Sequence, residues 1–283
     1  MPTNRRKNTE TNIINKRIMK IILILGITLF LLSAATLVLV CRLFLFHPCF
    51  DAEAYNYIAG KSKYEEVELT SEKGYYTGWL RKGNSKKTVL YFGGNAEYSA
   101  ITLFNRETLE LWDVFDGYNF LMIDYPKYGT SAGRLNEKNI MNMVDEAIDY
   151  ITHDPDLNEE IVVAGYSMGT GPAMYAASSN SDIRKLILVA PYDDMKNVFN
   201  SHANIFHGPF ALCLPIRFTM QGNHINAKSL IIASETDAVI PYNISLNVAE
   251  KIRDVELKSI KNASHGDLMC RGDTNKYIKD FLR

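Results

Sequence analysis

The stretch VVAGYSMGTG, residues 162–171, passes from a run of apolar residues directly to a serine between two glycines. The apolar residues predict a buried strand, and the small residues that follow predict a helix. Gly165 and Gly169 permit close packing around a sharp turn, which lifts the Ser167 hydroxyl clear of the backbone. The N-terminus of the helix favours developing negative charge. The stretch predicts Ser167 as a nucleophile; the alternative is a glycine-rich turn with an idle serine.

Short apolar runs recur along the chain and predict a parallel sheet that is covered on both faces. A hairpin is predicted from VELT, 67–70, and YYTGWL, 75–80. Between the runs, residues such as those of NEKNIMNMVDEAIDYIT repeat at helical spacing. Alternating strands and helices predict an α/β fold with a doubly wound, mostly parallel sheet. The predicted strands are TVLYF (88–92), FLMID (120–124), IVVAGY (161–166), KLILVA (185–190), SLIIAS (229–234) and, more weakly, VELKSI (255–260).

A serine hydroxyl needs a base, and the base needs an orienting acid. In folds with this kind of elbow the three residues follow the order Ser, Asp or Glu, His. Asp237 follows the strand SLIIAS, and His265 follows the last predicted strand. Both lie in loops after strands, where ligands meet a sheet of this kind. We therefore predict Asp237 and His265 as acid and base, with Asp193 or Asp194 as the alternative acid.

Two backbone N–H groups are needed to bind the oxyanion of an acyl-transfer reaction. One is expected from Met168, the residue after the nucleophile, and the other from the loop GGNAEY after the strand TVLYF. Asn95, directly after Gly94, is the candidate in that loop. The alternative is a tight turn that needs glycines for its shape alone.

A charged arm precedes a long uncharged run. Residues 1–20 carry six basic side chains and one glutamate, and residues 21–41, IILILGITLFLLSAATLVLVC, carry no charge. Such a run spans about 30 Å as a helix, the thickness of a bilayer core. It predicts a transmembrane anchor, with a cleaved signal peptide as the rival reading, since Ser33, Ala34 and Ala35 offer small residues for a cut.

Basic residues before the span predict a cytoplasmic N-terminus, which places the rest of the chain outside the cytoplasm. The periplasmic side of a bacterial inner membrane is the favoured location, and the lumen of a eukaryotic compartment is the alternative. Residues 42–62 are expected to be a linker and residues 63–283 an α/β domain. Residues 193–226 interrupt the strand–helix rhythm with aromatic, polar and proline residues. We expect them to form a short lid insertion. Its apolar side chains, among them Phe206 and Phe210, are expected to line an acyl pocket or to pack on the sheet.

Five motifs in order resemble the α/β-hydrolase superfamily, and in particular its single-span, membrane-anchored members known as α/β-hydrolase domain-containing proteins. They are YFGGNAE, DYPKYGTSAG, GYSMGTGPA, SETDAVIP and NASHGDL, and the similarity runs from about residue 65 to the end. The resemblance implies hydrolysis of an ester, thioester or amide, with carboxylic ester hydrolysis favoured. Gly93 departs from the pattern, because the family places there a histidine that braces the oxyanion loop. Pro126 and Lys127 replace an Arg-Gly pair.

The sequence thus predicts a membrane-anchored serine hydrolase that acts on a small or lipid-like acyl substrate. The alternatives are an inactive binding module that keeps the fold and an acyltransferase that uses the same triad. The formal net charge of −1 gives no general attraction to nucleic acid. No cofactor is implied, and no spacing indicates a metal site. Cys213 and Cys270 either pair or remain free thiols.

Overall fold

The computed structural model describes residues 3–41, 46–72, 74–220 and 224–283. The described residues form an eight-stranded sheet in the order β1-β2-β4-β3-β5-β6-β7-β8. Its strands are β1 (Tyr64–Ser71), β2 (Gly74–Arg81), β3 (Lys87–Phe92), β4 (Asn119–Ile123), β5 (Glu160–Tyr166), β6 (Ile183–Val189), β7 (Lys228–Ser234) and β8 (Val255–Ile260).

The pairing of the strands confirms the predicted α/β class. β1 and β2 form an antiparallel hairpin in which Ser71 pairs with Gly74, and β2 pairs antiparallel with β4. All other neighbouring strands are parallel. The central strands β3, β4, β5, β6 and β7 are almost entirely buried, as their continuous apolar runs predict.

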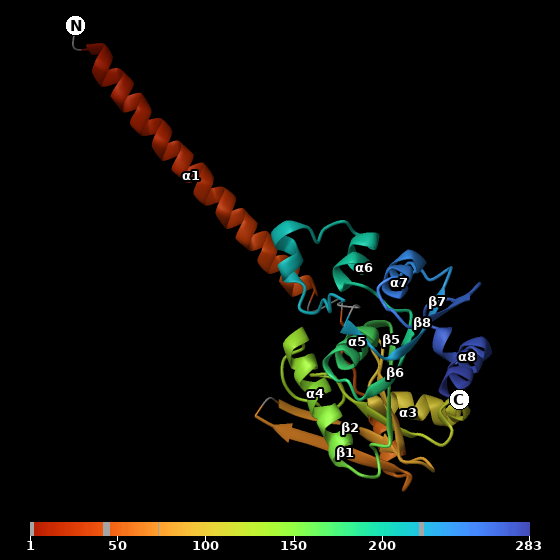
Figure 1. The fold of residues 1–283 in the computed structure, drawn as a ribbon. Helices are drawn as coiled ribbons and strands as arrows, with labels where there is room; N and C mark the ends of the chain where they lie inside the picture. Colours follow the sequence, from red (N-terminus) through yellow and green to blue (C-terminus); the bar gives the residue numbers. More distant parts are fainter. Residues whose placement is uncertain (1–2, 42–45, 73, 221–223) are drawn as a thin grey trace.

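Helices cover both faces of the sheet (Figure 1). α4 packs against α5 on one face, and α3 and α8 lie on the other. α4 shows why these segments are helical, because its six apolar residues at helical spacing, Ile140 to Ile151, are all buried. The helices of the body are α2 (Ala52–Ala59), α3 (Ser99–Thr108), α4 (Glu137–His153), α5 (Thr170–Ser179), α6 (Met195–His202), α7 (Tyr242–Ala249) and α8 (Gly272–Leu282).

The N-terminal helix α1 (Thr3–Val40) projects from the body (Figure 1). Within the described part of the chain, its stretch Asn15–Val40 is the one helix that is long and apolar enough to cross a bilayer. None of the most apolar window of this stretch is buried inside the protein. The apolar side chains of the helix therefore face outward except where its C-terminal end meets the body.

Two segments differ from their sequence-based descriptions. Residues 52–59, within the predicted linker, form α2, which packs against α3 and buries Ile58 completely. Residues 193–226 contain α6 and the short 3-10 helix η4 (Gly208–Cys213), and η4 lies against α1. Residues 42–45 and 221–223 of these two segments lie outside the described residues.

The strand order places the loops after β3 and β5 at one point of the sheet. From β3 the chain continues to β4 on one side, and then returns to β5 on the other side of β3. Phe92 at the end of β3 is paired with Gly165 near the end of β5. Ligands of open α/β sheets bind at such a switch point, outside the carboxyl ends of the strands. The serine loop and the glycine loop meet there.

Candidate active site

Ser167 stands on a sharp turn between β5 and α5. Its backbone φ is 53°, in the left-handed region that non-glycine residues rarely adopt and that costs about 1–3 kcal/mol. The flanking glycines are sterically required. A Cβ on Gly165 would lie 2.4 Å from the carbonyl oxygen of Gly169, and a Cβ on Gly169 would lie 2.0 Å from that of Phe92. The turn thus has the geometry expected from its sequence.

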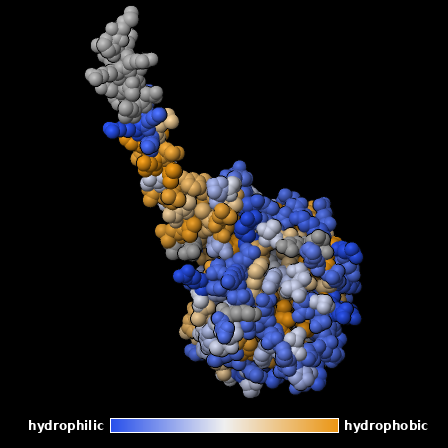
Figure 2. All heavy atoms as spheres, turned by 60° about the vertical axis from the view of Figure 1, so that its left-hand side comes forward, coloured by the Kyte–Doolittle hydropathy of each residue, from blue (hydrophilic) through white to orange (hydrophobic). Residues whose placement is uncertain are grey.

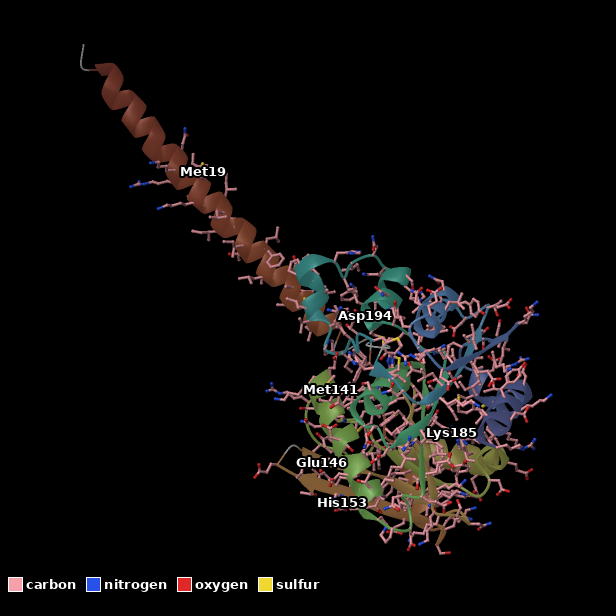
Figure 3. All side chains as sticks on the ribbon, in the orientation of Figure 1. Met19, Met141, Glu146, His153, Lys185 and Asp194 are labelled. Atoms are coloured by element: carbon pink, nitrogen blue, oxygen red, sulfur yellow. The ribbon has the colours of Figure 1, made fainter. Side chains whose placement is uncertain are left out.

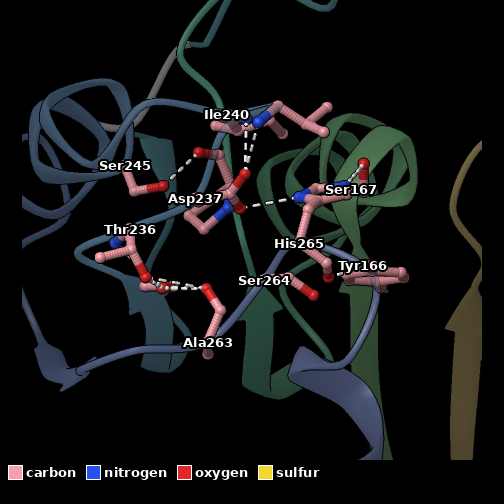
Figure 4. Close-up of polar contacts among 12 residues, drawn as sticks. Tyr166, Ser167, Thr236, Asp237, Ile240, Ser245, Ala263, Ser264 and His265 are labelled. Atoms are coloured by element: carbon pink, nitrogen blue, oxygen red, sulfur yellow. Dashed lines mark hydrogen bonds and ion pairs between the residues drawn. The ribbon is translucent and has the colours of Figure 1, made fainter.

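Three side chains from three loops form a continuous hydrogen-bonded chain (Figure 4). Nε2 of His265 lies 2.8 Å from Oγ of Ser167, and Nδ1 of His265 lies 2.7 Å from Oδ2 of Asp237. The Asp237 side chain is 1% exposed and that of His265 is 16% exposed. A serine, an imidazole and a buried carboxylate in this order are suited to proton transfer from the hydroxyl to the ring.

Hydrogen bonds connect the loop of Asp237 to the loop of His265 and hold the Asp237 side chain in place. The other oxygen of Asp237, Oδ1, accepts the backbone N–H groups of Val239 at 2.7 Å and Ile240 at 2.8 Å. The hydroxyls of Ser234 and Thr236 both donate to the carbonyl of Ala263, two residues before the base, at 2.7 and 3.1 Å. These bonds fix the distance between the carboxylate and the imidazole.

Tyr166, the residue before Ser167, also holds the loop of His265. Its hydroxyl donates to the backbone carbonyl of His265 at 2.5 Å, and its ring stacks on the imidazole at 5.3 Å between centroids. Burial raises the pKa of Tyr166, so the hydroxyl remains a donor. Sequence reasoning missed this residue because the variable position of a G-x-S-x-G motif carries no signal for a contact 99 residues away.

The alternative acids Asp193 and Asp194 are engaged elsewhere. Asp194 forms an ion pair with Arg217 and also accepts the hydroxyl of Thr219 at 3.0 Å. Burial raises the pKa of Asp194, but its hydrogen bonds and Arg217 outweigh this and hold it below the ordinary value. Asp193 accepts the side-chain amide of Asn197 at 3.0 Å. Asp194 lies where the chain approaches α1 (Figure 3).

The glycine loop after β3 approaches the nucleophile closely. A Cβ on Gly94 would lie 3.1 Å from the ring of Tyr166 and 3.6 Å from Cβ of Ser167. Asn95 turns its side chain toward other elements, since its Oδ1 accepts the Tyr128 hydroxyl at 3.0 Å and the backbone N–H of His47 at 2.9 Å. The backbone of the loop is thereby fixed beside Ser167 and Met168.

Glu97 supports this loop through hydrogen bonds, and its position accounts for the glycine at residue 93. Its Oε2 accepts the N–H of Gly94 at 3.0 Å and the hydroxyl of Tyr91 at 3.3 Å. A Cβ on Gly93 would lie 2.8 Å from that same oxygen and 2.8 Å from Cε of Met122. The space of the histidine that the family pattern places at position 93 is therefore already filled. Burial raises the pKa of Glu97, and its hydrogen bond from Gly94 opposes this shift.

A hollow in the body lies away from these residues. It has a volume of about 330 Å³ and lies between α4, α5 and the end of the 193–226 segment, with Met141, Met174 and Phe218 in its wall. None of Ser167, Asp237 and His265 lines it. The described residues contain no group of three or more His, Cys, Asp or Glu arranged to hold a metal ion. All four cysteines, including Cys213 and Cys270, are free thiols.

Comparison with known proteins settles the family. The sequence pattern described as the alpha/beta hydrolase fold matches residues 87–228, which hold both the glycine loop and the serine turn. The chain belongs to the α/β-hydrolase fold family. Among solved structures, an α/β-hydrolase fold of the same kind is found in the esterase Pf2001 of Pyrococcus furiosus. That structure matches with a TM-score of 0.65 and 19% identity, and the match covers 84% of this chain and 97% of the esterase.

Two curated relatives are similar over most of the chain. The uncharacterized protein YfhR of Salmonella typhi is 25% identical over 236 residues, which cover 75% of this chain and 78% of YfhR. The alpha/beta hydrolase domain-containing protein 17B of Xenopus tropicalis is 25% identical over 219 residues, or 70% of this chain and 67% of that protein. The resemblance to α/β-hydrolase domain-containing proteins stated from the motifs is thus confirmed.

Proposed function

We propose that this α/β-hydrolase is a membrane-anchored serine hydrolase that cleaves a carboxylic ester through an acyl-enzyme. The observation that carries the proposal is the hydrogen-bonded chain from Ser167 Oγ through His265 to Asp237, at 2.8 and 2.7 Å. The esterase among its structural neighbours agrees with this reaction. Thioesters and amides react by the same steps, and no cofactor or metal is required.

In the proposed reaction, Ser167 Oγ attacks the acyl carbonyl while Nε2 of His265 takes its proton. The carboxylate of Asp237 holds Nδ1–H and stabilises the imidazolium that forms. The backbone N–H groups of Met168 and Asn95 bind the oxyanion. His265 then gives its proton to the leaving oxygen as the bond to the acyl carbon breaks. Water, deprotonated by the same nitrogen, attacks the acyl-enzyme and frees the acid and Ser167.

A fluorophosphonate probe tests the proposal, because only an activated serine reacts with it. We expect one equivalent of label on the native chain, none on Ser167→Ala, and undiminished label on Ser201→Ala, a control at an exposed serine. Ester turnover of Ser167→Ala should fall by several orders of magnitude, about 10⁶ in a comparable triad. A native chain that takes no label would instead indicate a binding module. Transfer of the acyl group to added alcohol in preference to water would indicate an acyltransferase.

The proposed anchor is α1, with its N-terminus in the cytoplasm and the catalytic body outside it. Lys16, Arg17 and Lys20 precede the uncharged part of the helix, which favours this orientation. Cys41, at the far end, is completely buried against the body, which supports an anchor that stays part of the protein. A reporter that is active only outside the cytoplasm, fused after Arg283, should be active. Activity of a cytoplasmic reporter alone at that position would reverse the topology.

A further inference from the structure

One stripe of α1 is covered by the 193–226 segment. The ring of Phe30 lies 5.3 Å from that of Phe210, and the Cys213 thiol lies 3.8 Å from the carbonyl oxygen of Ala34. Further along, Cys41 and Leu37 pack with Phe206, Leu214 and Phe199. The helix residues in these contacts are 30, 34, 37 and 41, which share one face of a helix. Phe206 and Phe210 therefore pack against α1.

The contacts fix the depth of residues 205–216 relative to the bilayer. The stripe from Phe30 to Cys41 is about 16 Å long at 1.5 Å per residue. The uncharged part of the chain begins after Lys20, and a bilayer core needs about 20 apolar residues. If the bilayer core ended before Phe30, it would have to include the charged side chains of Lys16, Arg17 and Lys20. The outer leaflet must therefore reach the part of α1 that these residues cover.

The composition of residues 205–216 suits that depth. The stretch IFHGPFALCLPI contains no charged residue. Leu212 is 81% exposed and Ile205 is 50% exposed, although both are large apolar side chains. In Figure 2 the apolar surface of α1 continues onto the part of the body that it meets. Within the described residues, Leu212 and Ile205 belong to neither buried apolar cluster, whereas acyl chains would cover their side chains.

The backbone near this surface is satisfied from within the protein. The side-chain amide of Asn200 forms two hydrogen bonds with the backbone of Phe206. Its Oδ1 accepts the Phe206 N–H at 2.8 Å, and its Nδ2 donates to the Phe206 carbonyl at 3.1 Å. The N–H groups of His207 and Phe210 donate to carbonyls two and three residues earlier, at 2.9 and 3.1 Å. Backbone that enters lipid needs such internal partners, because acyl chains offer none.

We propose that residues 205–216 insert into the outer leaflet beside the anchor, with Leu212 and Ile205 among the acyl chains of the lipid. The inference rests on the proposed anchoring of α1. It also links the bilayer to the reaction centre. α6, which leads into this surface, ends at His202, whose Nε2 lies 2.8 Å from the carbonyl oxygen of Val239 in the acid loop. The segment is then a lid whose outer side is lipid, and acyl esters held in the leaflet are the substrates nearest to it.

Quenching by brominated lipids tests the insertion directly. Leu212→Trp and the control Leu109→Trp are reconstituted in phosphatidylcholine vesicles with bromine on the acyl chains. Leu109 is 59% exposed and lies at the end of α3 in the body, and the two native tryptophans contribute equally to both variants. We expect the added fluorescence of Leu212→Trp to be quenched and that of Leu109→Trp to remain. Equal quenching of the two, or none at Leu212→Trp, would overturn the inference.

Flotation of the same samples separates this proposal from the anchoring. If the chain floats with the vesicles but Leu212→Trp is not quenched, the anchor stands and the inserted surface fails. If the chain does not float, both fail. Leu212→Asp adds a functional readout. We expect about tenfold lower activity on a long-chain ester held in vesicles, with activity on a water-soluble short ester kept within about twofold. Leu109→Asp should change neither, and equal loss on both esters would contradict the proposal.

Discussion

The substitution Asp237→Asn tests the acid, because the backbone around residue 237 dictates which way the new amide faces. Oδ1 of Asp237 accepts two N–H groups, from Val239 at 2.7 Å and Ile240 at 2.8 Å. The amide oxygen of an asparagine must stay at this position, since an NH₂ group there would face two donors. The NH₂ group therefore takes the position of Oδ2, which lies 2.7 Å from Nδ1 of His265.

In this arrangement Nδ1 of His265 has to accept a hydrogen bond, so the neutral ring carries its proton on Nε2. Nε2 faces the Ser167 hydroxyl at 2.8 Å and can then no longer take a proton from it. A serine protease with this change in its acid lost about 10⁴ in kcat. We expect a similar loss here, which corresponds to about 5.5 kcal/mol of transition-state stabilisation at 1.36 kcal/mol per factor of ten.

The measurement is kcat for hydrolysis of p-nitrophenyl butyrate by the chain in detergent micelles. Asp193→Asn is the matched control, because the Asp193 carboxylate accepts the side-chain amides of Asn197 and Asn247 and lies near the cation of Lys251. Its kcat should stay within about threefold of the native value, as for a substitution outside the triad. The reverse ranking, or a loss below about tenfold for Asp237→Asn, would refute the assignment of the acid.

Three further substitutions test the groups around the triad. Tyr166→Phe keeps the ring on His265 but removes a hydrogen bond worth about 1 kcal/mol, so kcat should fall about fivefold at unchanged KM; an equal rise in KM would contradict a positioning role. Glu97→Gln keeps an acceptor for the Gly94 N–H, whereas Glu97→Ala does not, so kcat for ester hydrolysis should fall far more in the alanine variant. Equal kcat values in the two variants would show that the hydrogen bond from Gly94 to residue 97 does not support catalysis. Burial raises the pKa of Asp124 from 3.8 to about 7, so the folded state holds a proton that the unfolded state releases from about pH 4. The contribution of Asp124 to the free energy of unfolding should fall by about 3 kcal/mol from pH 4 to pH 7, measured as the difference between urea titrations of the native chain and of Asp124→Asn.

The serine turn was predictable from sequence because its requirements are local. The strand, the two glycines and the helix are neighbours in the chain, and each glycine is needed where a Cβ would meet a backbone oxygen. The order of serine, acid and base follows from the order of the parallel strands, since each residue comes directly after one of them. Asp237 was a prediction with two rivals, and the geometry of Asp193 and Asp194 now disfavours both.

The supporting contacts were not predictable, because they join residues far apart in the chain through ordinary side chains. The Tyr166 hydroxyl donates to a backbone carbonyl, and such a contact cannot be recognised from the amino-acid composition. Glu97 occupies the space next to Gly93, so the missing family histidine can be understood only from the packed loop. The covering of α1 by residues 205–216 depends on a contact between positions 30 and 210 that no periodicity encodes.

The chain just after α1 joins the proposed anchor to the glycine loop after β3. The N–H of His47 donates to Oδ1 of Asn95, and the Cys49 thiol lies 3.2 Å from the carbonyl oxygen of Ala96. Ala96 has a φ of 70°, so this loop is held in a conformation that needs outside support. Two residues of the predicted linker, His47 and Cys49, thus contact the glycine loop, and a soluble form that begins at residue 63 would lose these bonds. Since residues 205–216 connect through α6 to the loop of Asp237, both halves of the proposed reaction centre would be bound to elements at the proposed bilayer surface.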